Sequence, residues 1–261
     1  MSTYIMSDCH GRYDKFKNIL KKINFSNEDN LYILGDVIDR NENGIDILLY
    51  VMEHSNIHFI MGNHEDMFYK TVKNNNLILD NDNNFLFNYD MDLWFSNGGE
   101  VTARDFLSRD INIQNSIIRF LEDCDIVIPN LCVGDKQYYL VHAFPDKDLK
   151  SLKYIDNIGK YSLIQTLWER IYELARKLPK QMIMDNYFPK DKIVILGHTV
   201  TQKYHYYWGN FYNPLPKGIF KYYDCNNDLR FIDIDCGCAF KEKSEQVLCC
   251  LRLDDMEEFY D

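Results

Sequence analysis

Short hydrophobic runs alternate with amphipathic segments at the beginning of the chain. Three of the runs predict buried strands, at Thr3–Ser7, Leu31–Leu34 and Ile57–Met61. Between the first two, Tyr13–Ile23 carries apolar residues at helical spacing, and Ile45–Met52 predicts a second helix. Alternating strands and helices imply parallel pairing with right-handed crossovers. We therefore expect the carboxyl ends of the three strands at the same edge of one sheet.

The rest of the chain predicts a second group of strands, interrupted by a helical segment. A β-hairpin is expected over 131–141, a buried strand at 193–196 and three more strands over 219–253. The pattern is helical between Phe144 and Pro189, and the Asn- and Asp-rich region 73–92 predicts a surface loop or a broken helical segment. No internal repeat or interdomain linker is visible. We expect an α/β protein with a single domain over 1–261 and a helical or irregular insert around 144–190.

Polar residues stand where the predicted strands end. The segment Gly35–Arg40 places two acids and an arginine directly after the second strand. Ligands bind at the carboxyl ends of strands in open α/β sheets, so Asp36 could hold a metal ion, Asp39 could orient a neighbour and Arg40 could bind an anion. The alternative is a polar turn with an internal Asp–Arg pair. The neighbouring strand ends decide between these interpretations.

Six candidate metal ligands follow strands of the predicted sheets: Asp8, His10, Asp36, Asn63, His142 and His198. Two carboxylates, one amide oxygen and three imidazoles suit manganese, iron or zinc better than calcium or magnesium. The set is too large for one tetrahedral site, and it divides into two groups that share one acid. Two ions about 3.5–4 Å apart can bind one phosphoryl group between them. The sequence therefore predicts two divalent metal ions, with manganese as the first choice.

Composition limits the kinds of ligand that we expect the protein to bind and its expected location in the cell. The net charge of −11 argues against non-specific nucleic-acid binding, but metal ions in a cleft would still allow a phosphate ester to bind. The N-terminus lacks a signal-peptide pattern, and no apolar run is long enough for a membrane span. We expect a cytoplasmic protein that binds neither nucleic acid nor membranes, and its 8 cysteines to be reduced.

Three motifs together resemble the signature of calcineurin-like metallophosphoesterases. They are Asp8-x-His10, Gly35-Asp36-x-x-Asp39-Arg40 and Gly62-Asn63-His64-Glu65, and the later segments Asn97-Gly98-Gly99, Gly197-His198-Thr199 and Ile234-Asp235-x-Gly237 extend the match. The resemblance covers most of the chain and is nearest to the phosphoprotein phosphatase branch, including small bacterial and phage serine/threonine phosphatases. It implies a central β-sandwich of mixed sheets flanked by helices.

The resemblance also implies a role for each matching residue. Asp8 and His10 would bind the first metal ion, Asp36 would bridge both, and Asn63, His142 and His198 would complete the second site. His64 would donate a proton to the leaving oxygen, and Asp39 would hold His64 in position. Arg40 would bind the substrate phosphate together with a second arginine. Arg170 is the best match for that arginine, and Arg176 is the alternative.

The activity implied is hydrolysis of a phosphate ester by in-line attack of a hydroxide that bridges two metal ions. A phosphorylated protein is the expected substrate, as for a serine/threonine phosphatase. A symmetrical diadenosine-tetraphosphate hydrolase is an alternative within the same family. A catalytically inactive phosphate-binding module is the non-enzyme alternative, and it is disfavoured because every expected ligand and the expected acid are present. The eukaryotic C-terminal loop of the Ser-Ala-Pro-Asn-Tyr type has no match, so binding of regulatory subunits is not carried over.

Overall fold

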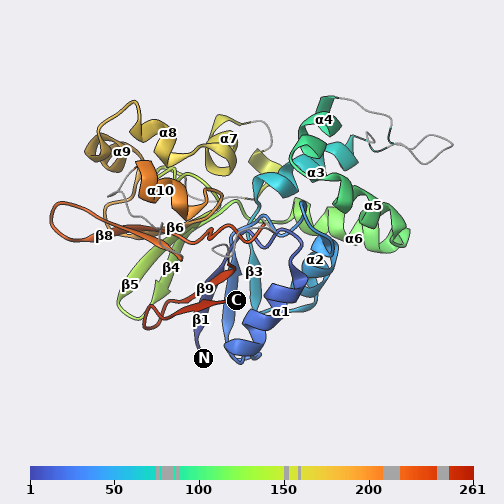
Figure 1. The fold of residues 1–261 in the computed structure, drawn as a ribbon, viewed down its shortest axis with the longest axis horizontal. Coiled ribbons are helices and arrows are strands. Elements are labelled where there is room, and N and C mark those ends of the chain that lie inside the picture. The colour runs from blue at the N-terminus through green and yellow to red at the C-terminus, as the bar shows by residue number, and fades with distance from the viewer. Residues whose placement is uncertain are drawn as a thin grey trace.

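The structure is a computed structural model that describes residues 1–74, 77, 85, 89–149, 153–157, 160–207, 218–239 and 247–261. Two five-stranded sheets lie at its centre, and helices cover them on both sides (Figure 1). Both sheets contain parallel and antiparallel pairs. The predicted fold class, an α/β sandwich of mixed sheets flanked by helices, is thus confirmed.

The first sheet contains the N-terminal strands and the end of the chain. Its order is β10-β9-β1-β2-β3. The strands are β1 (Thr3–Met6), β2 (Asn30–Ile33), β3 (Ile57–Phe59), β9 (Cys249–Arg252) and β10 (Glu258–Tyr260). The first three are parallel, as predicted, because α1 (Tyr13–Lys22) and α2 (Gly44–Glu53) connect them as crossovers. The C-terminal strand β10 was not predicted from the sequence.

The second sheet has the order β4-β5-β6-β8-β7. The expected hairpin forms from β4 (Val127–Val133) and β5 (Lys136–Val141), followed by β6 (Ile193–Leu196), β7 (Phe220–Tyr223) and β8 (Leu229–Asp233). Large aliphatic and aromatic side chains from both sheets form a buried core between them, among them Ile5, Leu140 and Ile232. β5, β6 and β8 are mutually parallel, so their carboxyl ends also share one edge.

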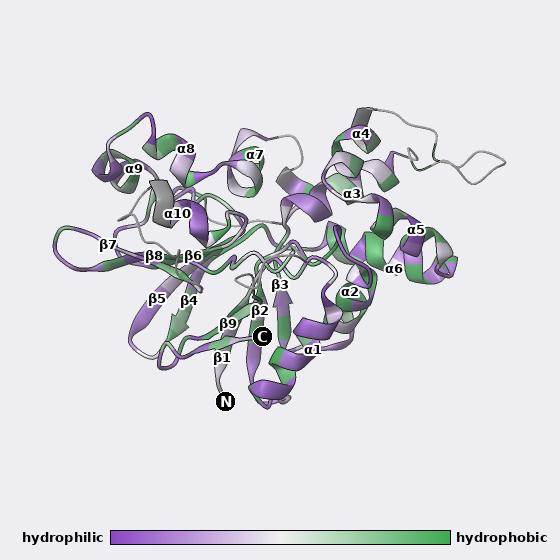
Figure 2. Ribbon diagram, in the orientation of Figure 1, coloured by the Kyte–Doolittle hydropathy of each residue, from purple (hydrophilic) through white to green (hydrophobic). Residues whose placement is uncertain are grey.

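The remaining helices cover the outer faces of the sandwich. They are α3 (Asn63–Lys73), α4 (Tyr89–Ser96), α5 (Glu100–Ser108), α6 (Ile111–Glu122), α7 (Tyr161–Trp168), α8 (Ile171–Ala175), α9 (Lys180–Tyr187) and α10 (Thr201–Tyr207), with a 3-10 turn at Ile155–Asn157. Hydrophobic and hydrophilic residues alternate along α1, α5 and α6, as expected for helices that pack one face on the protein (Figure 2). None of the described helices is long and apolar enough to cross a membrane.

Three features of the helices differ from the sequence pattern. Helices α3, α5 and α10 were not predicted. The hydrophobic stripe from Leu163 to Leu178 is interrupted, because Glu169 and Arg170 adopt extended backbone conformations between α7 and α8. Most of the Asn- and Asp-rich region 73–92 lies outside the described residues, and its last part begins α4.

Candidate active site

The carboxyl ends of β1, β2, β3, β5 and β6 meet where the two sheets adjoin, and every predicted metal ligand follows one of these strands. The backbone there is unusual. Six residues of this region other than glycine have positive φ angles: Asp8 (53°), His10 (43°), Asp36 (55°), Asp39 (70°), Arg40 (66°) and His198 (65°). Such angles are costly, and they persist where the surroundings hold the backbone in place, as at functional sites.

Asp36 lies at the centre of the site. It belongs to two groups of buried ligand atoms, one with His10 and His64 and one with His142 and His198, and in each group the atoms lie within 4.8 Å of one another. The Oδ2 atom of Asp36 is 3.4 Å from His142 Nε2 and 3.7 Å from His10 Nε2. Asp36 thus belongs to both groups, which is the place that the resemblance assigns to the bridging ligand.

Asp8 lies at the edge of the first group. Its Oδ1 atom is 3.9 Å from His10 Nε2, and its Oδ2 atom accepts hydrogen bonds from the Ser7 hydroxyl and the His198 amide. The tighter group around His10 includes His64, the predicted acid, where the sequence prediction has Asp8. The structure therefore places Asp8 beside the first group, with its Oδ2 atom already bound to protein donors.

Backbone carbonyls orient the imidazoles. His10 Nδ1 lies 2.9 Å from the carbonyl oxygen of Ile38, and His142 Nδ1 lies 2.6 Å from that of Leu34. Because carbonyls only accept, these nitrogens carry the protons, and Nε2 is available for a metal ion. His198 is turned the other way, since its Nε2 lies 3.2 Å from the carbonyl oxygen of Trp168 and leaves Nδ1 for a metal ion.

The predicted amide ligand joins the second group. Asn63 is the first residue of α3, and its Oδ1 lies 3.0 Å from His142 Nε2. All six predicted metal ligands are buried, with 7% or less of their surface exposed. The structure therefore assembles every one of them around Asp36.

The titration behaviour of these groups reflects their burial and mutual charge. Burial, followed by the charges of Arg40 and Arg170 respectively, lowers the pKa of His10 and His198 well below the usual value. Both are therefore neutral, which is the form that binds metal ions. Burial opposes the charge on His142, but Asp36 and Asp8 together outweigh it and raise the pKa of His142 to about 9, so a metal ion at Nε2 would replace its second proton. Burial likewise opposes the charge on Asp36, but His142, His64 and His10 together hold its pKa well below the ordinary value.

Glu65 organises the loop after β2, and the sequence prediction gave it no role. Its carboxylate is fully buried. Oε2 accepts from the amides of Asp36 (2.8 Å) and Gly62 (3.1 Å), and Oε1 accepts from the amide of Val37 (2.9 Å). Glu65 thus ties the loop that carries Asp36 to the start of α3. The available signal was a glutamate at the third position of a helix, which is typical of a capping box.

His64 lies between a carboxylate and a guanidinium. Its Nδ1 is 2.6 Å from Asp39 Oδ2, and its Nε2 is 3.0 Å from Arg40 Nη2. A guanidinium only donates, so Nε2 accepts from Arg40 while Nδ1–H donates to Asp39. The predicted pairing of Asp39 with His64 is present, and Nε2 is the nitrogen that faces Arg40 and Asp36.

Arg170 reaches the site from the break between α7 and α8. Its Nη1 donates to the carbonyl oxygen of His198 (2.9 Å) and to the hydroxyl of Thr199 (3.2 Å). Arg176 follows the last residue of α8, further along the insert. The extended backbone at Glu169 and Arg170, which the hydrophobic stripe did not reveal, brings Arg170 to His198.

The donor set fits a pair of divalent ions. Buried carboxylates normally have partners of opposite charge. Asp8 instead lies near another acid: burial and the nearby charge of Asp235 raise the pKa of Asp8 well above the usual value. A cation beside Asp8 and Asp36 would remove this repulsion, and neutral imidazole and amide donors complete the coordination that borderline divalent ions prefer.

Comparison with known proteins supports the family. The family model described as calcineurin-like phosphoesterase matches residues 1–226. The chain belongs to the calcineurin-like phosphoesterase family. Two solved structures share this phosphoesterase's fold. One is a metallophosphoesterase from Sphaerobacter thermophilus (TM-score 0.53, 13% identity, 100% of this chain and 86% of that chain covered). The other is a protein serine/threonine phosphatase from Saccharomyces cerevisiae (TM-score 0.54, 10% identity, 100% and 79% covered).

Among the sequence relatives of this phosphoesterase is a symmetrical bis(5′-nucleosyl)-tetraphosphatase from Haemophilus ducreyi. It is 37% identical over 67 residues, which are 25% of this chain and 25% of that protein. The chain thus spans about a quarter of the length of this relative. At 10–13% identity the two structural matches show the fold alone. Family membership establishes a phosphoesterase hydrolase, and the substrate has to be argued from the site.

Proposed function

We propose that this phosphoesterase is a metal-dependent phosphomonoesterase that removes phosphate from phosphorylated serine or threonine in proteins. The single observation that carries the proposal is the arrangement Asp39–His64–Arg40 beside Asp36. Serine and threonine leave as alkoxides, which are poor leaving groups and gain from a general acid. A positioned acid contributes about 10²–10⁴-fold to such reactions.

Each residue has a task in this proposal. His64 delivers a proton from Nε2 to the leaving oxygen, while Asp39 fixes the ring through Nδ1. Arg40 and Arg170 hold the non-bridging phosphate oxygens, for which the planar guanidinium is well suited. When substrate binds, Arg40 turns from His64 Nε2 to the phosphate, and Nε2 takes up a proton from solvent, which it then passes to the leaving oxygen.

We further propose that Asp8, His10 and Asp36 hold one divalent ion and that Asp36, Asn63, His142 and His198 hold the other. Manganese is the proposed metal, with iron and zinc as alternatives that the same donors accept. Two such ions supply an activated water molecule and neutralise charge on the phosphoryl group. The residues of the chain position the ester between the two ions, the arginines and His64.

A second candidate is hydrolysis of a symmetrical dinucleoside tetraphosphate. The name of the Haemophilus ducreyi relative favours it. The leaving group of that reaction is a nucleoside diphosphate, which needs less protonation than an alkoxide. A general acid held by a buried carboxylate therefore contributes more to the first candidate than to the second.

The test is a side-by-side assay of the protein with Mn²⁺ on a phosphoserine peptide, diadenosine tetraphosphate and a 5′-phosphorylated oligonucleotide. We expect the phosphopeptide to be hydrolysed fastest. Hydrolysis of the dinucleotide alone would replace the first candidate with the second, and no hydrolysis of any substrate would indicate an inactive phosphate-binding module. Asp36→Asn is the control, because loss of the shared ligand should abolish the reaction.

A further inference from the structure

The corner between α4 and α5 contacts Asp39 and Arg40, which lie in the loop after β2. We propose that this corner, residues 94–102, positions the general acid His64. Within the corner, the indole of Trp94 fixes the orientation of the Asp39 carboxylate. The proposal rests on the proposed function, because it assigns these residues to the reaction of His64.

Trp94 and His64 share one oxygen atom. The indole Nε1 of Trp94 donates to Asp39 Oδ2 at 2.8 Å, and His64 Nδ1 lies 2.6 Å from the same atom. The other oxygen, Oδ1, is buried and accepts no hydrogen bond within the described part of the chain. Two donors on one oxygen fix the rotation of the carboxylate. Without the indole N–H, His64 alone would orient Asp39.

The same corner holds the backbone on which Asp39 and Arg40 stand. The amide of Asp39 donates to the Thr102 hydroxyl (2.9 Å), and the amide of Arg40 donates to the carbonyl oxygen of Gly98 (3.0 Å). Both residues have positive φ angles, 70° and 66°. An L-residue in this conformation needs its neighbours to hold it. The corner therefore fixes the proposed partner of the acid and a proposed phosphate ligand together.

The corner is closely packed around Trp94. Trp94 is fully buried, and its ring centroid lies 5.4 Å from that of Phe68 in α3, the helix that begins beside His64. A Cβ atom on Gly99 would lie 2.3 Å from Trp94 Nε1, so the indole occupies the space that a side chain at 99 would need. This packing leaves the indole no room to move toward the turn at Gly99.

A purely structural role for Trp94 makes a different prediction. A core tryptophan also needs a partner for its N–H, and Asp39 could be that partner without any effect on catalysis. A packing role would alter stability and would change the rates of all substrates equally. A positioning role acts through His64, so its loss should reduce the rate most where the leaving group depends most on protonation.

The experiment compares Trp94→Phe with the wild-type protein in Mn²⁺, using p-nitrophenyl phosphate and a phosphoserine peptide. Phenylalanine keeps the ring packing and removes the donor. Phe106→Leu is the matched control, because Phe106 packs on Phe68 (centroids 5.0 Å apart) in the same cluster and its side chain has no hydrogen-bond donor. Thr102→Val and Thr102→Ser test the backbone contact, with serine restoring the hydroxyl.

We expect Trp94→Phe to lower kcat for the phosphopeptide by about tenfold more than for the aryl phosphate, with KM little changed. Thr102→Val should lower kcat and raise KM for both substrates, since it loosens Asp39 and Arg40 together, and Thr102→Ser should recover both. Equal losses on the two substrates, matching those of Phe106→Leu, would overturn the proposal. If the wild-type protein hydrolyses neither substrate, the proposed function fails instead, and the two failures are thus distinguishable.

Discussion

Tyr154 attaches the insert to the helix that begins at the active site. Its hydroxyl donates to Asp66 Oδ1 at 2.6 Å, and Asp66 Oδ2 accepts from Lys70 Nζ at 2.8 Å. Tyr154 and Asp66 are both buried. Replacing Tyr154 with phenylalanine removes one oxygen and leaves an oxygen of a charged carboxylate without its donor. A hydrogen bond to a charged group contributes about 1.5–3 kcal/mol.

The loss should be visible in thermal unfolding. For a protein of this size, 1 kcal/mol corresponds to roughly 2–4 °C in Tm, so Tyr154→Phe should lower Tm by about 3–12 °C. Circular dichroism at 222 nm would follow the transition, and a matched urea titration would give the free energy of unfolding.

Tyr139→Phe is the control for this prediction. Tyr139 is equally buried, but its hydroxyl donates to a neutral acceptor, the carbonyl oxygen of Asp146, at 2.9 Å. A neutral hydrogen bond contributes about 0.5–1.5 kcal/mol, so the control should lose less stability. If Tyr154→Phe keeps wild-type stability, or loses less stability than Tyr139→Phe, then the hydrogen bond to the Asp66 carboxylate does not anchor the segment around Tyr154.

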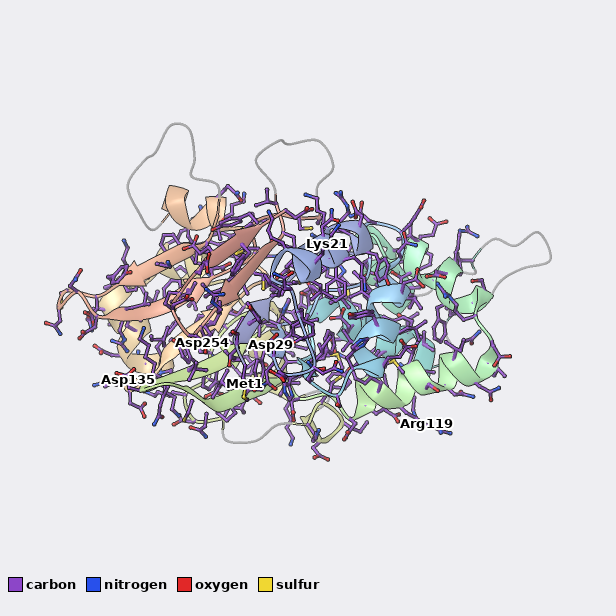
Figure 3. The ribbon with its side chains drawn as sticks, turned by 90° about the horizontal axis from the view of Figure 1, so that it is seen from below. Met1, Lys21, Asp29, Arg119, Asp135 and Asp254 are labelled. Carbon is purple, nitrogen blue, oxygen red and sulfur yellow. The ribbon has the colours of Figure 1, made fainter. Side chains whose placement is uncertain are left out.

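Three further predictions concern the metal site, the α4–α5 corner and the N-terminal face. Removing divalent metal with EDTA should lower Tm and abolish hydrolysis, and Mn²⁺ should restore both, because bound ions stabilise only the folded site; an unchanged Tm would contradict this. Gly99→Ala should cost about 1–3 kcal/mol in urea unfolding, because its Cβ would lie 2.3 Å from Trp94 Nε1; wild-type stability would contradict this packing. Asp29, beside Met1 on the face seen in Figure 3, accepts hydrogen bonds from the Ser2 amide at 2.8 Å and from Ser26. Burial opposes its charge, but these bonds and the N-terminal charge together outweigh burial and lower its pKa. Asp29→Asn should therefore reduce stability at pH 7 but not in strong acid. A lowered carboxyl pKa stabilises the fold above about pH 4, and this gain disappears as pH falls through the folded-state pKa. An equal loss of stability at pH 7 and pH 2 would show that the charge is unimportant.

Much of the first sheet follows from local pattern. The runs at Thr3–Ser7, Leu31–Leu34 and Ile57–Met61 are short and apolar, and the helices between them leave parallel pairing as the only short connection. The polar residues after each strand could therefore be placed together before any contact was known. The hydrogen bonds that Asp8 accepts from Ser7 and from the His198 amide could not be predicted, because they depend on side-chain geometry across the sandwich.

The parts that the sequence did not reveal depend on tertiary contacts. The stripe from Leu163 to Leu178 has continuous helical spacing, yet the chain extends at Arg170, whose side chain bonds to His198. Trp94 has the pattern of any core tryptophan, and only the structure shows its N–H on Asp39. Strand β10 is short, and its pairing with β9 is set by the fold of the chain around it. Local propensity carries no information on these contacts.

The positive φ angles at the site lower the stability of the fold at residues whose side chains the proposed activity needs. Each such residue, other than glycine or asparagine, costs of order 1–3 kcal/mol, and Asp8, His10, Asp36, Arg40 and His198 all have this conformation. Glycine at any of these positions would relieve the backbone while removing a functional side chain. Random mutation selected for thermal resistance in the absence of divalent metal ions should therefore enrich substitutions in this region, and the resulting proteins would be stable and inactive. The natural sequence retains the less stable solution at every one of these positions.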